Sequence, residues 1–235
     1  MGRYDREFYD RTWQGEDYTS EQQLVRTIAE LAAAEVPSGR HLDVGCGNGV
    51  VMKALRNDHP GVSSVGTDFS LAALGQMRQA SVCLADARRL PFPSNTFDLV
   101  TACEVLEHIL EFDAALDEMV RVCKPRGVLV LSVPNFVGLS HRISMLLGNY
   151  PDRWEHLHPF THEKFRRDLQ ARGLEVCKLV GDFLRIPVLV PIPRLGLRRR
   201  VNWRLRAGTR LFPHLSAHVV AVCRKRSPTS SSRGG

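Results

Sequence analysis

The residues with the strongest chemical signal form a glycine-rich segment directly after a short apolar run. Residues 43–49 read DVGCGNG. Glycines let the backbone turn tightly, and without a Cβ they let a ligand approach closely. The helix predicted after this segment would offer unpaired N–H groups at its N-terminus. The spacing G-x-G-x-G is not the G-x-G-x-x-G of dinucleotide sites, and the chain has no G-x-x-x-x-G-K-[ST] phosphate loop. The segment therefore predicts a binding turn and weakens both of these nucleotide interpretations.

Two acidic residues and one aromatic residue narrow the ligand further. Asp68 ends a predicted strand about twenty residues after the turn, where a carboxylate can accept from both hydroxyls of a ribose. Asp86 ends the next predicted strand, where a carboxylate can accept from an exocyclic amine. Phe69 offers a flat apolar partner for a purine ring. Together these residues describe a site for an adenosine that carries a non-phosphate tail.

The elements that must position these residues alternate along the chain. Continuous apolar runs between helical patterns predict an α/β fold with a doubly wound, parallel sheet that helices cover on both faces. A helix with Ser20 as its N-cap precedes the first strand, and another helix begins at the N-cap Thr161 and stops at Gly173. The predicted strands are 41–45, 63–68, 81–86, 96–103, 126–134, 174–180 and 216–225, and the predicted helices are 20–35, about 49–57, 70–79, 104–123, 138–147 and 161–173.

Four segments, in this order and spacing, resemble the class I S-adenosylmethionine-dependent methyltransferases. They are LDVGCGNG (42–49), VGTDFS (65–70), CLADARRLPFPSNTFDLVTACEVLEH (83–108) and RVCKPRGVLVLSVPN (121–135). Within that superfamily the chain is similar to the small-molecule branch that includes the ubiquinone-pathway O-methyltransferases, over roughly residues 38–180. The resemblance implies a Rossmann-like sheet of seven strands, with the last strand antiparallel and inserted beside the fifth.

The resemblance also implies roles for individual residues, with S-adenosyl-L-methionine as the cofactor. The three glycines of the turn would shape the pocket for the methionine moiety, and Asp68 would take the ribose. Asp86 and Ala87 would face the adenine, while Cys103 or Glu104 would border the methionine end. The full predicted set of cofactor-binding residues is Asp43, Gly45, Cys46, Gly47, Gly49, Asp68, Phe69, Asp86, Ala87 and Cys103.

Glu104, Glu107 and His108 are the candidates for catalysis. At i, i+3 and i+4 of a predicted helix, their side chains would share one face. Such a trio could bind a divalent ion, and some ubiquinone-pathway relatives are thought to use one for magnesium. Alternatively His108 alone could act as the general base, because a neutral imidazole accepts a proton near pH 7. A third interpretation makes Glu107 and His108 a hydrogen-bonded pair at a helix start.

A histidine-rich segment follows the fifth predicted strand and would overhang the open end of the pocket. It contains Trp154, His156 and His158. The two histidines alternate, so an extended backbone would place both on one side. Zinc would need a third and a fourth ligand that the sequence does not identify. We therefore expect a structural or substrate-contacting role.

Length and composition predict one domain. The chain has 235 residues, 43% hydrophobic and 24% charged, which is typical of a globular protein. Six scattered cysteines without a C-x-x-C pair argue against zinc and disulfide frameworks. A charged N-terminal segment and the lack of a long apolar run predict a cytoplasmic protein, peripheral at the membrane at most. We expect a methyltransferase domain at 1–225, with an N-terminal helical cover (1–37), a lid (181–215) and a disordered tail at 226–235.

Charge is distributed unevenly. Residues 183–235 contain 12 of the 32 basic residues and none of the 25 acidic ones. Three prolines prevent a continuous helix through the apolar part of this region, and arginines alternate with leucines and Trp203 after it. This pattern suits a contact with an anionic membrane, a lid over a lipid or isoprenoid substrate, or a surface helix packed on the domain. Nucleic-acid binding is the weakest interpretation, because no RNA-binding module is recognisable.

The sequence thus predicts methyl transfer to a small or lipid-like acceptor, with oxygen as the first expectation for the methylated atom. The chain has ACEV at 102–105, where amine-methylating nucleic-acid enzymes carry an NPPY-like tetrad. This weakens base methylation without excluding other nitrogen or carbon acceptors. Two alternatives stay open: an RNA methyltransferase that uses the basic C-terminal segment, and a non-catalytic scaffold that keeps the cofactor fold.

Overall fold

A mixed sheet of seven strands forms the centre of the protein. The computed structural model describes residues 6–15, 22–77, 81–139, 141–142, 157–182, 184–192, 197–205 and 213–227. Six strands are parallel to one another, and the last strand lies antiparallel between two of them, which confirms the predicted fold class. In spatial order the strands are β3 (Val82–Leu84), β2 (Val62–Asp68), β1 (Gly39–Val44), β4 (Phe97–Cys103), β5 (Cys123–Pro134), β9 (His218–Lys225) and β6 (Leu174–Gly181).

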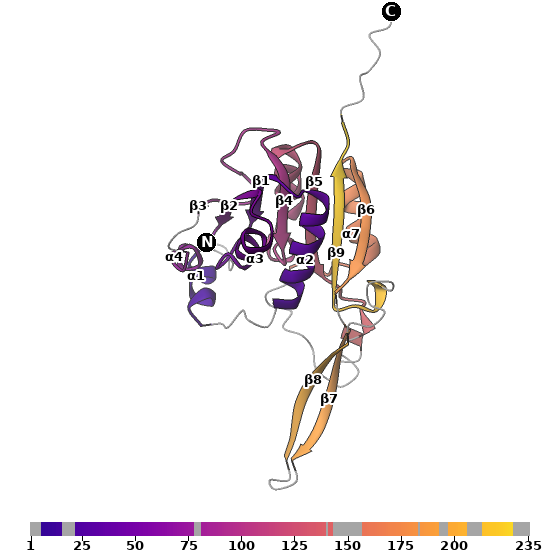
Figure 1. Cartoon of the computed structure of the whole chain (residues 1–235). Coiled ribbons are helices and arrows are strands. Elements are labelled where there is room, and N and C mark those ends of the chain that lie inside the picture. Colours follow the sequence, from indigo (N-terminus) through magenta and orange to yellow (C-terminus); the bar gives the residue numbers. More distant parts are fainter. Residues whose placement is uncertain are drawn as a thin grey trace, which may run out of the picture.

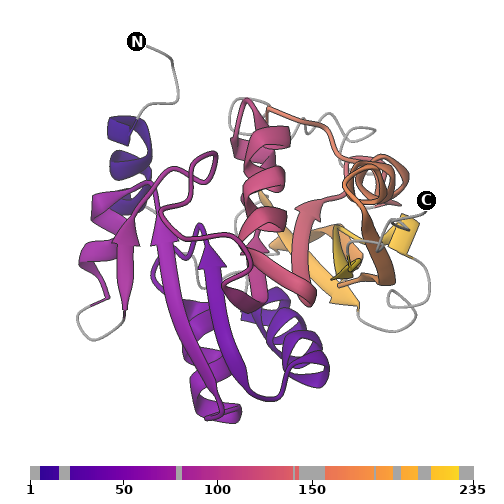
Figure 2. The same cartoon turned by 90° about the horizontal axis from the view of Figure 1, so that it is seen from above.

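Helices cover both faces of this sheet (Figure 1; Figure 2). Successive apolar residues of a strand point to opposite faces of the sheet. Leu99 and Val128 therefore pack against one pair of helices, and Val100 and Leu129 pack against a second pair on the other face. This is why the strands are continuously apolar. The first pair is α2 (Gln22–Glu35) and α3 (Val50–Asp58), the second is α5 (Phe112–Val122) and α7 (His162–Ala171), and α1 (Arg6–Gly15) packs with α4 (Leu71–Gly75) near the β3 edge.

The predicted signals at the two ends of α7, Thr161 and Gly173, are confirmed, and Ser70 is a further N-cap that was not predicted as one. Ser70 caps α4, because its side chain accepts a hydrogen bond from the backbone of Ala73, and Thr161 caps α7 in the same way through Lys164. Gly173 follows α7 with φ +72. The predicted cap Ser20 and most of the predicted helix 138–147 lie outside the described residues.

The prediction of a helix at 104–123 is wrong in its first half. β4 ends at Cys103, Glu104 takes φ +55, and a short 3-10 helix, η2 (Leu106–His108), comes before α5. A residue with positive φ cannot continue a right-handed helix. Consequently Glu104, Glu107 and His108 do not lie along one face of a single α-helix.

The predicted lid region contains a second, two-stranded sheet. β7 (Leu184–Ile192) pairs with β8 (Leu197–Leu205) as an antiparallel hairpin, and η3 (Pro213–Leu215) leads back to β9. The alternative of a surface helix here is therefore wrong. Proline fits a two-stranded ribbon because its missing N–H can face the open edge. The hairpin projects away from the body of the protein (Figure 1). No helix among the described residues is long and apolar enough to cross a membrane.

Candidate cofactor and acceptor site

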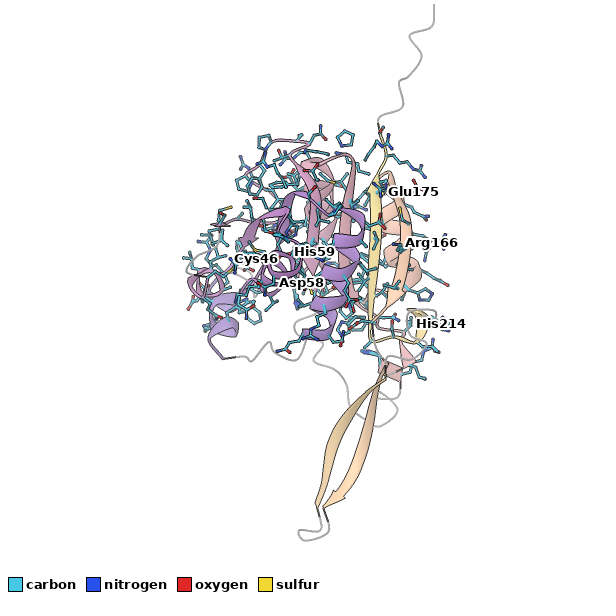
Figure 3. The ribbon with its side chains drawn as sticks, in the orientation of Figure 1. Cys46, Asp58, His59, Arg166, Glu175 and His214 are labelled. Atoms are coloured by element: carbon cyan, nitrogen blue, oxygen red, sulfur yellow. The ribbon has the colours of Figure 1, made fainter. Side chains whose placement is uncertain are left out.

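The glycine turn lies at the carboxyl end of β1, where helix α3 begins. Gly45, Gly47 and Gly49 all have positive φ, at +67, +52 and +75, so side chains would be strained there. A Cβ on Gly45 would come within 2.5 Å of Val105, and one on Gly47 within 2.4 Å of the Trp13 ring. The turn therefore combines a left-handed backbone with close packing, and Figure 3 labels Cys46 in it.

Asp68 holds this turn from the end of β2. One carboxylate oxygen accepts from the backbone N–H of Gly47 at 2.8 Å, and the other accepts from the N–H of Ser70 at 2.8 Å. Burial raises the pKa of Asp68, while these hydrogen bonds oppose the shift. A carboxylate has about four acceptor positions, so two remain for the hydroxyls of a ribose.

A buried polar chain lies beneath the turn. Nδ1 of His41 is 2.9 Å from the hydroxyl of Ser64, and Nε2 is 2.7 Å from the hydroxyl of Thr101, which donates to Asp43 at 2.6 Å. Burial lowers the pKa of His41 to about 3 and raises that of Asp43 to about 7. A neutral imidazole with its proton on Nε2 satisfies this arrangement. Asp43, which lies just before the glycine turn, is thus held by Thr101. Burial also raises the pKa of the Cys46 thiol.

Asp86 is held by its own neighbour. Its two oxygens accept a bidentate pair of hydrogen bonds from Arg88, which also pairs with Glu111. The hydrogen bonds from Arg88 lower the pKa of Asp86. Ala87 packs against the core beside this pair. The carboxylate is fixed as an anion at the end of β3, and its predicted contact with adenine stays a prediction.

Helix α1 closes the site from above, and sequence reasoning missed its residues. The hydroxyl of Tyr9 donates to the backbone carbonyl of His108 at 2.8 Å, and its ring packs edge-on against Phe69. Asp10 accepts from the Ser70 hydroxyl at 2.5 Å. Tyr9 and Trp13 are four positions apart and so share one face of a helix. That spacing is a signal that the sequence contains, although 1–37 was predicted only as a cover.

A second residue that sequence reasoning missed is His218, which meets the predicted Glu104 at the carboxyl ends of β4 and β5. Oε2 of Glu104 is 2.7 Å from Nδ1 of His218, and Oε1 accepts from the hydroxyl of Ser132 at 2.7 Å. The side chains of Glu104 and His218 are 17% and 9% exposed. His218 opens β9 and pairs with Pro134 of β5, which brings it to this edge of the sheet. A carboxylate and an imidazole in contact form an acid–base pair.

The residues of η2 contribute a different pair. Nε2 of His108 lies 3.7 Å from Oε1 of Glu107, whose side chain is fully buried, whereas the His108 side chain is 29% exposed. Glu104 is directed to His218 instead. Among the described residues, no group of three or more His, Cys, Asp or Glu side chains is arranged to hold a metal ion.

His158 anchors the segment that follows the undescribed residues. Its Nε2 lies 2.9 Å from the carbonyl oxygen of Ile109 and 3.0 Å from that of Leu110, and its ring packs against Phe112. The backbone N–H of Leu157 also donates to the carbonyl of Glu107. These contacts give His158 a structural position beside η2. Trp154 and His156 lie outside the described residues.

All six cysteines are free thiols.

Comparison with known proteins decides the family. The model of the methyltransferase domain family matches residues 16–179, which is more than half of the chain. The chain belongs to this family. A demethylmenaquinone methyltransferase of Corynebacterium urealyticum is 40% identical over 160 residues, which cover 59% of this methyltransferase and 69% of the relative. A ubiquinone/menaquinone biosynthesis C-methyltransferase UbiE of Cupriavidus necator is 41% identical over 115 residues, or 45% of this chain and 46% of that one.

Solved structures support the fold of the methyltransferase. A putative methyltransferase in complex with the Trm112 activator of Haloferax volcanii has a TM-score of 0.66 at 19% identity, covering 93% of this chain and 98% of its own. Magnesium protoporphyrin IX methyltransferase from Synechocystis, solved with bound SAH, has a TM-score of 0.62 at 15% identity, covering 94% and 97%. The expectation of a class I S-adenosylmethionine-dependent methyltransferase is confirmed. The protein is an enzyme of this class, and S-adenosylmethionine is its cofactor.

Proposed function

We propose that the enzyme methylates a quinone-like or other lipid-like small molecule, and that carbon is the first acceptor atom to test. The observation that carries this proposal is the similarity to relatives named for demethylmenaquinone and for ubiquinone/menaquinone C-methylation. These names do not favour oxygen, which was the first expectation from sequence. Because the chain spans less than half of the Cupriavidus relative, the acceptor itself is a proposal.

The residues at the ends of β1 and β2 fit the cofactor. The lack of a Cβ lets Gly45 and Gly47 adopt positive φ and pack closely against Val105 and the Trp13 ring, so the turn adds little bulk of its own where a tail would lie. Asp68 would hold the ribose through its remaining acceptor positions. Phe69 would contact the purine ring, while Asp86 would accept from its amine. Bound S-adenosylmethionine supplies an electrophilic methyl group on its sulfonium.

The remaining task of the protein is to orient the acceptor and remove a proton. Methylation of an aromatic carbon beside a hydroxyl proceeds fastest when that hydroxyl is ionised, and methylation of the oxygen itself also needs the proton removed. We assign the proton acceptance to the Glu104–His218 pair. The carboxylate of Glu104 fixes His218 and stabilises its imidazolium form, and Ser132 fixes Glu104. His108 is the competing base, and its position on η2 beside Tyr9 keeps it near α1.

The chemistry explains the value of a closed site. Packing of α1 over the glycine turn, through the Trp13 ring against Gly47, excludes water from the region where an in-line transfer would occur. His158 positions the segment on the acceptor side of η2. Trp154 and His156 remain predicted acceptor contacts.

Labelled S-adenosylmethionine with a panel of acceptors tests the proposal. The panel contains a reduced demethylated naphthoquinol, a phenol with a blocked ortho position, a free isoprenoid alcohol and an RNA oligonucleotide. We expect label on a ring carbon of the quinol. Label on the hydroxyl oxygen would restore the original oxygen expectation, and label only on RNA would support the RNA methyltransferase alternative. Cofactor binding without transfer to any of the four would show that the acceptor belongs to another chemical class.

A further inference from the structure

The register of the β7–β8 hairpin separates its residues into two chemically different faces. Residues that pair directly across antiparallel strands lie on the same face, and the face alternates from one pair to the next. The pairs Leu184–Leu205, Ile186–Trp203, Val188–Val201, Val190–Arg199 and Ile192–Leu197 share one face, on which nine of the ten residues are apolar. The pairs Arg185–Arg204, Pro187–Asn202, Leu189–Arg200 and Pro191–Arg198 share the other face, which has four arginines.

The hairpin leaves the sheet at the same edge as the cofactor site. β6 is antiparallel to β9, and β9 is antiparallel to β5, so β6 runs parallel to β5 and ends at the edge where the parallel strands end. The glycine turn and Glu104 lie at this edge. Figure 1 shows the hairpin projecting beyond it, and Figure 3 labels His214 of η3 at the base of the hairpin.

We propose that the hairpin formed by β7 and β8 docks the enzyme onto an anionic lipid membrane. The apolar face would enter the membrane interface, and the arginines would bind lipid phosphates. Within the described residues, neither strand pairs with a strand of the main sheet, so both outer edges carry backbone groups that need water or head groups. This fits a ribbon lying in the interface. Nine residues per strand make it about 30 Å long, at roughly 3.3 Å per residue.

Charge and residue type favour a membrane over other partners. The two strands of the hairpin carry five arginines and no acidic residue, which complements an anionic surface. A single-stranded nucleic-acid surface combines arginine with stacking aromatic residues. Here Trp203 shares its face with eight aliphatic residues and Arg199, whereas the other four arginines of the hairpin strands lie on the opposite face. Tryptophan with aliphatic residues on one face and arginine on the other is the pattern of an interfacial element. Docking would bring the edge of the sheet that carries the glycine turn and Glu104 towards acceptors dissolved in the membrane. This last step rests on the proposed function, in which the acceptor is lipid-like.

The test uses the full chain with sedimenting vesicles, and neither cofactor nor acceptor is added, so its outcome does not depend on methyl transfer. One set of vesicles is phosphatidylcholine and the other is phosphatidylcholine with phosphatidylglycerol. Each arginine near an anionic surface contributes about 1 kcal/mol, so R185Q/R200Q/R204Q should weaken binding about 100-fold. R26Q/R56Q/R166Q makes the same charge change at exposed positions of the main domain and should bind like the wild type. Salt near 0.5 M should release the wild-type protein.

Adjacent residues on β8 test the two faces. V201D and N202D add the same charge to opposite faces of the hairpin. N202D should weaken vesicle binding about fivefold, while V201D should weaken it at least tenfold more, because its carboxylate would enter an apolar interface. Circular dichroism of both variants checks whether the fold is retained. Trp203 emission, isolated as the difference from W203F, should shift to the blue only with anionic vesicles.

Several results would overturn the inference. Equal binding losses in the two arginine triple variants would show a general charge effect, and equal losses in V201D and N202D would remove the two-face arrangement. A stable dimer by light scattering, dispersed by V201D, would make a second copy the occupant of the apolar face. Salt-dependent RNA binding without vesicle binding would favour a nucleic acid. Absence of pelleting in every condition would reject membrane docking outright.

Discussion

Oε2 of Glu104 lies 2.7 Å from Nδ1 of His218, although 114 positions separate the two residues in the chain. The contact depends on β9 lying beside β5, because only that placement brings the first residue of the last strand next to the residue that follows β4. The pair joins a residue predicted from sequence to one that was not.

Replacing His218 by Gln should lower kcat about 10²- to 10⁴-fold while cofactor affinity stays near the wild-type value, because the imidazole is assigned to accept a proton. Glu104→Gln should also lower kcat and should move the acidic limb of the pH–rate profile to lower pH, because the imidazolium of His218 loses the carboxylate that stabilises it. Stopped assays over pH 5–9, with calorimetric titration of the cofactor, provide the measurement.

His108→Gln serves as the competing test. If the Glu104–His218 pair accepts the proton, this variant keeps kcat within about threefold. A 10²-fold loss in H108Q with normal activity in H218Q would transfer the role to His108. Loss of activity with a chelator and recovery with magnesium would instead support the metal alternative from the sequence. A parallel fall in melting temperature and cofactor affinity of H218Q would make its role structural.

Asp68→Ala should weaken cofactor binding by roughly 1.5–3 kcal/mol, because the side chain would lose charge-assisted hydrogen bonds to a ribose. The same change releases the N–H groups of Gly47 and Ser70, so thermal stability should fall as well. Asp68→Asn retains an acceptor oxygen and should cost less in stability while still weakening the cofactor. Asp58→Ala, at an exposed position at the end of α3, is the control. Cofactor affinity within twofold of the wild type in D68A would contradict the ribose assignment.

Trp13→Ala should raise the cofactor dissociation rate at least tenfold with a smaller effect on the association rate. The indole ring lies over Gly47, so its removal opens the turn to water without altering the turn itself. Stopped-flow fluorescence with a fluorescent cofactor analogue measures both rates. Tyr9→Phe, which removes only the hydrogen bond to the His108 carbonyl, should have an intermediate effect. Unchanged dissociation in W13A would show that α1 does not retain the cofactor.

The buried His41–Thr101–Asp43 chain predicts two opposite pH dependences of folding stability. The pKa of His41 is lowered to about 3, so its contribution is present above its unfolded pKa near 6.5 and is lost as pH falls. The pKa of Asp43 is raised to about 7, so its contribution is present below about 4 and is lost as pH rises towards 7. In the wild type the two trends oppose each other between pH 4 and 6.5.

Single variants should separate these trends. The stability cost of His41→Gln should be largest at pH 7 and shrink towards pH 4, whereas the cost of Asp43→Asn should be largest at pH 4 and shrink towards pH 7. Urea denaturation at several pH values measures both. Costs that change in the same direction with pH would contradict the shifted pKa values.

Much of the sheet was predictable from the sequence because its order produces local patterns. Both faces are buried, so β4 and β5 are continuously apolar, and the glycine turn and Asp68 mark strand ends. The start of α5 was not predictable in this way, because EVLEH at 104–108 has good helix formers and only the positive φ of Glu104 interrupts the helix. Pro187 and Pro191 are four positions apart, so both lie on one face of β7. This spacing is compatible with a strand, but the prolines were interpreted only as residues that interrupt a helix. His218 needed the register of β9 against β5, which local sequence does not encode.

The connection between β6 and β9 has a consequence for how this domain can diversify. Gly181 and Val219 lie opposite each other in adjacent strands, so the whole segment between them closes a loop whose ends are already together. The entropy of closing such a loop grows only logarithmically, by about 0.6 kcal/mol for each doubling of its length. Exchange, shortening or extension of residues 183–212 therefore leaves the catalytic sheet nearly unaffected. Replacement of this single connection could change where in the cell the domain binds, while the reaction that it catalyses stays the same.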